Sequence, residues 1–236
     1  MRERAPLVLH GVSLDLGASD PLDAHYLGEL AALAERFQPA WLSDHLCWTA
    51  HGGAHLHDLL PLPHTEEAAR HVAARIREVQ ARLGRRIAIE NVSSYVRFTD
   101  DSMSEGEFLA AISSEADCGI LLDLNNLLVN AHNHGADAEA AVAALDPARI
   151  FQIHLAGLSE AGALLVDTHD HPVRDECWTL FERAIAKLGP VSTLIEWDDR
   201  IPPWERVVAE AARARKIIER AWGVDVRRVP PAEAAA

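Results

Sequence analysis

Metal-binding side chains stand in or directly after each of six short apolar runs. The runs are Leu7–Val12, Ala40–Ser43, Ile87–Ile89, Gly119–Leu122, Ile150–Ile153 and Thr193–Ile195. The polar residues that go with them, in the same order, are His10, Asp44-His45, Glu90-Asn91, Asp123 with Asn125, His154, and Glu196 with Asp198. Neutral imidazole beside carboxylates suits iron, manganese or zinc, and no thiolate accompanies them.

Each of these residues also has an ordinary structural interpretation. His10 alone could be a core histidine, Asp123 could begin an Asx-turn, and Asp167-Thr-His169 could be a solvated loop. Glu90 and Glu196 are harder to explain in this way, because a carboxylate flanked by aliphatic residues is rarely buried without a partner. The two glutamates therefore favour the metal-site interpretation.

Longer amphipathic segments separate the apolar runs and predict helices. They span Leu22–Phe37, Glu66–Leu83, Ser104–Glu115, Ala136–Leu145, Glu176–Leu188 and Trp204–Trp222. Aliphatic strands that alternate with helices predict a parallel sheet covered on both faces, as in a barrel or a doubly wound sheet. The 236-residue chain suits one such domain, residues 1–225, followed by a flexible tail, residues 226–236.

Two connections, Leu46–Thr65 and Leu155–Asp175, are unusually long and carry no predicted element. Both follow a strand, on the face where α/β barrels build their active sites. The second connection adds Asp167 and His169 to the potential ligands. The other loop histidines are expected to be pocket or surface residues: His51, His55, His57, His64, His132, His134 and His171.

Charge and cysteine content narrow the class of protein. The formal net charge is -14, which argues against a nucleic-acid partner. No apolar stretch is long enough to span a membrane, and no signal peptide is recognisable. Cys47, Cys118 and Cys177 are far apart, so a disulfide framework is not indicated and a reducing, cytoplasmic location is expected.

The order of the motifs resembles one family, the multinuclear non-haem iron-dependent oxidative enzymes that include the methanobactin-forming oxygenase. The resemblance covers about residues 7–205. It rests on Leu9-His-Gly-Val12, Ser43-Asp-His-Leu46, His51-Gly-Gly53, Asp58-Leu-Leu-Pro-Leu-Pro63, Ile89-Glu-Asn91 with Ser94-Tyr95, Leu122-Asp-Leu-Asn-Asn126, Ala131-His-Asn-His-Gly135, Ile153-His-Leu-Ala-Gly157, Asp167-Thr-His169 and Leu194-Ile-Glu-Trp-Asp198.

The resemblance implies an oxidoreductase that uses two or three iron ions and dioxygen to modify cysteine residues of a ribosomally synthesised precursor peptide. A small companion protein would present the peptide. The implied iron ligands are His10, His45, Glu90, Asp123, Asn125, His154, Asp167, His169 and Glu196. Glu90 and Glu196 match carboxylates that bridge two irons in the family, and Asp198 is a potential base or a group that supports a ligand.

One departure from the family concerns the fold. Family members generally begin with two further strands before the segment that matches Leu9-His-Gly-Val12. The expected architecture is therefore a TIM-barrel-like (β/α) fold without the first two strands of the family barrel, with open sheet edges.

Two other functions remain open on the sequence. The chain could be a divalent-metal isomerase or hydrolase, because sugar isomerases and apurinic endonucleases use related barrels with two or three metals. It could also bind metal or peptide without turnover. Redox-active iron with dioxygen consumption would distinguish the oxygenase from both.

Overall fold

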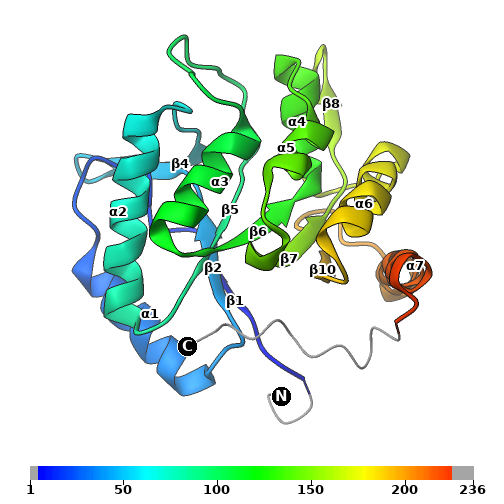
Figure 1. Ribbon diagram of the computed structural model, residues 1–236, viewed down its shortest axis with the longest axis horizontal. Coiled ribbons are helices and arrows are strands. Elements are labelled where there is room, and N and C mark those ends of the chain that lie inside the picture. Colours follow the sequence, from blue (N-terminus) through cyan, green and yellow to red (C-terminus); the bar gives the residue numbers. More distant parts are fainter. Residues whose placement is uncertain (1–4, 225–236) are drawn as a thin grey trace.

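The structure is a computed structural model that describes residues 5–224 (Figure 1). The tail predicted for residues 226–236 lies outside this range. A central parallel sheet is flanked by helices, and the chain alternates between the two for most of its length. This arrangement agrees with the expected α/β class.

All six predicted strands are present and form one parallel sheet of order β1-β2-β5-β6-β7-β10. They are β1 Leu9–Gly11, β2 Leu42–His45, β5 Ala88–Glu90, β6 Gly119–Asp123, β7 Ile150–Leu155 and β10 Ser192–Ile195. The sheet is a parallel half-barrel, in which β1 and β10 are the two edges among the described strands. The expected TIM-barrel-like fold with a shortened set of strands is thus confirmed.

The six predicted helices also form. They are α1 Ala24–Phe37, α2 Glu66–Leu83, α3 Glu105–Ala116, α5 Ala138–Ala144, α6 Asp175–Leu188 and α7 Trp204–Trp222. Ser104 and Glu107 make the predicted capping box at the start of α3, and Gly84 ends α2 in a left-handed conformation. Buried aliphatic residues of these helices share the main core with residues of the sheet, such as Ile89 and Ile120.

A smaller apolar cluster fills the concave side of the sheet. It consists of Trp41, Ala88, Leu121 and Phe151. Side chains two residues apart on a strand point to the same face, so the residues that follow on this face are Glu90 after Ala88 and Asp123 after Leu121. The concave side therefore changes from apolar to acidic toward the carboxyl ends of the strands.

Three features were not predicted. Helix α4, Leu124–His134, begins directly after β6 with Asp123 as its N-cap, and Pro147–Arg149 forms a short 3-10 turn. The two long connections are not structureless, because each folds into an antiparallel hairpin. The hairpin strands are β3 Trp48–His51, β4 Ala54–Leu60, β8 Ser159–Ala161 and β9 Leu164–Val166.

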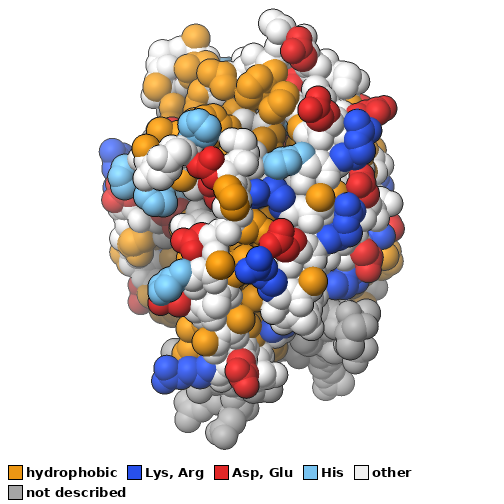
Figure 2. Space-filling view, turned by 90° about the vertical axis from the view of Figure 1, so that its left-hand side faces the viewer, with side chains coloured by type: hydrophobic (Ala, Val, Ile, Leu, Met, Phe, Trp, Pro, Cys, Tyr) orange, Lys and Arg blue, Asp and Glu red, His pale blue; other side chains and the backbone are white. Residues whose placement is uncertain are grey.

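The helical surface mixes the two signs of charge. Figure 2 shows basic and acidic side chains intermingled on the face that lies at the left of Figure 1. On α2, Arg70 pairs with Glu66 and Arg82 with Glu78, each one helical turn apart. Within residues 5–224, no helix is long and apolar enough to cross a membrane.

Candidate metal centre

Glu90 is the hub of a polar cluster at the carboxyl ends of the strands. Its side chain is only 3% exposed. One carboxylate oxygen, Oε2, lies 2.9 Å from Nε2 of His10 and 3.2 Å from Nε2 of His45. The strand register brings these residues together, because His45 of β2 is aligned with Glu90 of β5.

The outer nitrogens of these two histidines are held by the sheet. Nδ1 of His45 donates to the carbonyl oxygen of Gly11 at 3.1 Å, so the neutral ring presents an unprotonated Nε2 to the cluster. Nδ1 of His10 lies 2.8 Å from the hydroxyl oxygen of Ser43. Metal-binding histidines are typically anchored in this way through the nitrogen that does not bind the metal.

His154 lies on the other side of Glu90. Its Nδ1 is 3.1 Å from Oε1 of Glu90 and 3.0 Å from Oε2 of Glu196, which directly follows β10. Asp123 is aligned with His154 in the neighbouring strand and is completely buried. Donor atoms of Glu90, Asp123, His154 and Glu196 all lie within 4.8 Å of one another.

A third part of the cluster comes from the β9–α6 connection. Nε2 of His169 lies 2.7 Å from Oδ1 of Asp167, which also accepts a 2.7 Å hydrogen bond from Nδ2 of Asn125. Nδ1 of His169 is 3.1 Å from Oδ2 of Asp198 and 3.4 Å from Oε2 of Glu196. Asp198 has a 66% exposed side chain, so it lies at the solvent side of the cluster.

All nine residues expected to bind metal therefore belong to one continuous cluster, together with Asp198. Among residues 5–224, three groups have donor atoms close enough to share an ion: His10 with His45 and Glu90; Glu90 with Asp123, His154 and Glu196; His169 with Glu196 and Asp198. Glu90 and Glu196 each belong to two groups. A carboxylate has two oxygens, so each glutamate can bridge two neighbouring ions.

Several donor atoms in the cluster are buried but make no hydrogen bond of suitable geometry. They are Glu90 Oε2, Asp123 Oδ2, Asn125 Oδ1, His154 Nδ1 and His169 Nε2. Leaving a buried polar atom without a partner costs about 1 to 3 kcal/mol. This cost applies in full to Asp123 Oδ2 and Asn125 Oδ1, whereas Glu90 Oε2, His154 Nδ1 and His169 Nε2 lie within ion-pair distance of other members of the cluster. Such buried N and O atoms from separate parts of the chain fit a site that holds cations.

The titration of the cluster shows how its charges balance without a cation. Burial by itself would lower the pKa of His154, but the carboxylates of Glu196 and Glu90 raise it to about 10. Burial would also lower the pKa of His169, but the carboxylate of Asp167 raises it to about 10. Burial raises the pKa of Asp123 well above its usual value, and the neighbouring Asp167 carboxylate adds to this. Protons on imidazoles thus occupy positions that divalent cations would take over.

Close backbone packing fixes the segment that carries His169. The backbone N–H of His169 donates to the carbonyl of Gly157 at 3.1 Å. The carbonyl of His169 accepts from the backbone N–H of Asp198 at 3.0 Å. A Cβ at Gly157 would lie 1.9 Å from the carbonyl oxygen of His171. Only glycine permits this approach.

An asparagine network behind the cluster holds the backbone of one central ligand, Asp123. The side chain of Asn91 accepts from the N–H of Asp123 at 2.9 Å and donates to its carbonyl at 3.0 Å. Asn126 donates to the carbonyl of Asn91, and Asn130 to that of Val92. The sequence marked Asn91 only as part of a motif, because hydrogen bonds across some 30 residues leave no local pattern.

The three cysteines take no part in the cluster. Cys47, Cys118 and Cys177 are free and buried. Burial raises the pKa of all three thiols, to about 12 for Cys118. They are neutral, buried side chains.

Known proteins resemble this chain over most of its length. A UPF0276 protein of Anaeromyxobacter sp. strain Fw109-5 is 54% identical over 217 residues, which cover 92% of this chain and 77% of that protein. A UPF0276 protein of Caulobacter vibrioides strain NA1000 / CB15N is 49% identical over 217 residues, covering 91% of this chain and 78% of that protein.

Two solved structures with a similar fold are sugar epimerases. The 3-keto-D-glucoside 4-epimerase of E. coli matches with a TM-score of 0.54 and 14% identity, over 90% of this chain and 78% of the other. The D-psicose 3-epimerase of Clostridium cellulolyticum H10 matches with a TM-score of 0.55 and 13% identity, over 93% and 78%. At this identity the likeness establishes the TIM-barrel fold alone.

A family model described as "RiPP precursor modification enzyme MbnB/TglH/ChrH" matches residues 1–219. This match covers the half-barrel and every residue of the cluster, in agreement with the resemblance carried by the motifs. The chain therefore belongs to the MbnB/TglH/ChrH family of RiPP precursor modification enzymes.

Proposed function

We propose that this protein is a multinuclear non-haem iron oxygenase that modifies cysteine residues of a ribosomally synthesised precursor peptide. The observation that carries the proposal is the convergence of the buried Glu90 and the partly buried Glu196 with four histidines, His10, His45, His154 and His169. Nitrogen and oxygen donors without thiolates suit iron in its ferrous form. Membership of a family of precursor-modifying enzymes supports a peptide substrate.

The side chains that would hold the ions are the nine residues of the cluster, with Glu90 and Glu196 as the bridging carboxylates. Bound ferrous ions would supply two things, activation of dioxygen and a lowered pKa for a coordinated cysteine thiol. The protein itself keeps this site dry on one side, because Glu90, Asp123 and His154 are at most 2% exposed.

Solvent access is on the side of His10 and Asp198. The side chain of His10 is 26% exposed and that of Asp198 66%. A peptide cysteine would approach from this side. We assign Asp198 a positioning role, because its carboxylate accepts from Nδ1 of His169 and so leaves Nε2 to face the cluster.

The proposal includes the partners and the location. The net charge of -14 favours a basic or cysteine-rich companion protein that presents the peptide. Three buried free cysteines without a disulfide among them support a reducing, cytoplasmic compartment.

The direct test uses a short cysteine-containing peptide as the candidate precursor. The peptide is incubated with anaerobically prepared, iron-loaded protein, and dioxygen is then admitted. We expect dioxygen uptake and a mass change confined to cysteine, found by tandem mass spectrometry. A peptide with serine in place of cysteine is the matched control and should stay unchanged.

Two results would contradict the proposal. One is full activity of zinc- or manganese-loaded protein without dioxygen uptake, which would favour the isomerase or hydrolase class. The other is iron loading without any change of peptides that carry cysteine, which would favour a binding protein without turnover.

A further inference from the structure

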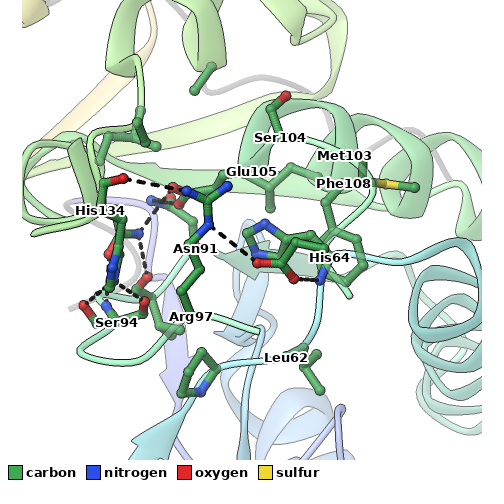
Figure 3. A pocket seen from close by; sticks show the side chains of 18 of the residues that line it. Leu62, His64, Asn91, Ser94, Arg97, Met103, Ser104, Glu105, Phe108 and His134 are labelled. Carbon is green, nitrogen blue, oxygen red and sulfur yellow. Dashed lines mark hydrogen bonds and ion pairs between the residues drawn. The ribbon is translucent and has the colours of Figure 1, made fainter. Parts of the chain in front are cut away.

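A cavity separate from the metal cluster lies on the far side of Asn91 from that cluster. Its volume is about 210 Å³. It is enclosed by the β4–α2 connection, the segment 92–104 and helices α3, α4 and α5 (Figure 3). The close-up shows Glu105 and Asn91 together, with His134 and Ser94 on one side and His64 and Phe108 on the other.

Most of the cavity wall is apolar. Leu62, Leu127, Met103 and Phe108 contribute to it. The imidazole of His64 stacks on Phe108 with ring centroids 4.8 Å apart, and burial lowers the pKa of His64, which favours its neutral form. The two rings give the cavity a flat aromatic side that suits an alkyl chain or the face of a cation.

The chemically unusual group in this cavity is the carboxylate of Glu105. It accepts from Nδ2 of Asn91 at 3.3 Å and from Nδ2 of Asn130 at 3.0 Å. Within residues 5–224, no nitrogen of Lys, Arg or His lies within 4.0 Å of it. Burial raises the pKa of Glu105 to about 7, since two neutral amides do not compensate a buried negative charge.

The residue as a whole is only half-buried, while its carboxylate group is surrounded by protein. Glu105 lines the cavity, so the exposed part of this residue faces the cavity while its carboxylate is enclosed by protein. A ligand inside the cavity would then contact Glu105 directly.

Two charged groups at the rim, Arg97 and Asp101, are already paired. The guanidinium of Arg97 lies 3.6 Å from Oδ2 of Asp101 and donates to the carbonyl of His134 at 3.4 Å. Asp101 also accepts from the N–H of His64 at 2.7 Å. Arg97 is therefore not free to bind an anionic ligand. Asp137, which also lines the cavity, is exposed and caps α5, so the buried carboxylate of the lining without a cationic partner is that of Glu105.

We propose that this cavity binds an alkylammonium or alkylguanidinium group, with the cation at the Glu105 carboxylate and the alkyl stem against the apolar and aromatic wall. The volume suits such a group, since an engineered apolar cavity of about 150 Å³ admits benzene. The positive charge of the ligand would supply the ionic partner that the buried Glu105 carboxylate lacks.

The group has two sources, a Lys or Arg side chain of a peptide and a free small amine. The peptide source rests on the proposed function, whereas the binding of a free cation does not. Asn91 would connect such a ligand to the metal cluster, because it contacts Glu105 and also holds the backbone of Asp123.

The test uses n-butylammonium and n-butylguanidinium with the full-length chain, at a pH near 8 where Glu105 is mostly ionised. The chain contains two methionines, Met1 and Met103, so ¹³C-methyl methionine NMR reports on the cavity through Met103. We expect both cations to shift the Met103 signal with a dissociation constant on the order of millimolar. The uncharged n-butanol should bind at least tenfold more weakly.

Two variants identify the carboxylate. Glu105→Gln should weaken binding of both cations at least tenfold. Glu107→Gln, two residues further along α3 and exposed, should leave it unchanged because glutamine preserves the capping box. Equal binding of n-butanol and the cations, unchanged binding by Glu105→Gln, or no shift of Met103 would each overturn the inference.

A capped Ala-Arg-Ala peptide and its citrulline analogue decide the source. Stronger binding of the arginine peptide than of n-butylguanidinium would assign the cavity to a peptide side chain. Binding of the free cations alone would assign it to a small amine. Because no iron is needed in these titrations, their failure would leave the proposed function untouched.

Discussion

Two glutamates carry most of the account at the scale of single residues. Glu90 contacts His10, His45 and His154, and Glu196 contacts His154 and His169. Neither carboxylate has Lys or Arg within ion-pair distance among the described residues, so histidines are their only potential cationic partners there. Such a cluster fits cations better than it fits a purely structural role.

Replacement of Glu90 should dismantle two metal groups at once. In Glu90→Gln, we expect the affinity for ferrous ion to fall on the order of 100-fold or more, because a ligand shared by two ions is lost. Anaerobic titration with ferrous ion measures this. Glu115→Gln, on the exposed end of α3, is the control and should bind like the wild type. Equal iron binding by the two variants would contradict the assignment.

Glu105 makes a prediction about stability and pH. Its pKa is about 7 when folded, against 4.5 as the ordinary value. The folded state therefore keeps its proton to higher pH than the unfolded state does, and this residue's contribution to stability falls as pH rises from about 4.5 to about 7.

The free energy of unfolding of Glu105→Gln should thus rise relative to wild type across this window. The expected change is roughly 1 to 3 kcal/mol, with the lower figure allowing for solvent in the cavity. Urea unfolding at several pH values measures it. A difference in the free energy of unfolding between the two proteins that stays constant from pH 4.5 to pH 8 would be inconsistent with a buried carboxyl group whose pKa is raised.

At the scale of elements, the segment around His169 depends on its backbone contact with Gly157. In Gly157→Ala the new Cβ would collide with the carbonyl oxygen of His171, so the segment must move. We expect a loss of roughly 1 to 3 kcal/mol of stability, together with weaker iron binding because His169 is displaced.

Gly28→Ala is the matched control for this variant. Gly28 lies in the exposed part of α1, and a Cβ there meets no atom within 4 Å. This variant should gain roughly 0.5 to 1 kcal/mol and keep wild-type iron binding. Thermal unfolding with iron titration separates the two cases. Similar behaviour of both variants would show that the contact at Gly157 does not position His169.

The elements that were predictable carry strong local signals. Each of the six sheet strands overlaps an apolar run of the sequence. Helix α2 matches its predicted bounds of Glu66–Leu83, because Thr65 caps its start and Gly84 its end. Helix α4 was missed because it follows β6 without a break. The apolar residues at the start of the helix, such as Leu124 and Leu127, therefore continue the apolar run of the strand. The hairpin β3–β4 was missed because five of the seven residues in β4 are exposed, and the strand has no clean alternation of apolar and polar side chains.

The candidate site was predictable for a different reason. Parallel strands bring their carboxyl ends to one side of the sheet, so residues at those ends converge whatever their separation in sequence. The asparagine network and the cavity at Glu105 follow instead from contacts between α3, α4 and segment 92–104. Such contacts depend on how helices pack and leave no periodic pattern.

At the scale of the whole molecule, the cluster joins the two edges of the half-barrel. His10 belongs to β1 at one edge, and Glu196 directly follows β10 at the other. His10 contacts the central residue Glu90, and Glu196 contacts the central residue His154. Ions held by this cluster would therefore tie together parts of the sheet that share no hydrogen bonds.

Ferrous ion should consequently slow amide exchange at both edges. Anaerobic hydrogen exchange with mass spectrometry measures this for peptides that cover residues 9–11 and 192–195. A free ion concentration near 100 times the dissociation constant adds about 2.7 kcal/mol, or about 100-fold slower exchange for amides that open only on unfolding. Unchanged exchange at both edges with iron bound would contradict this role.

The central claim is that this cluster holds more than one iron ion. Its most direct test is the iron content of wild-type protein after anaerobic reconstitution with ferrous ion and removal of loose metal, measured by elemental analysis with Mössbauer spectroscopy. The account predicts two or three ions per chain, with magnetic coupling between them. One ion per chain or fewer would contradict it.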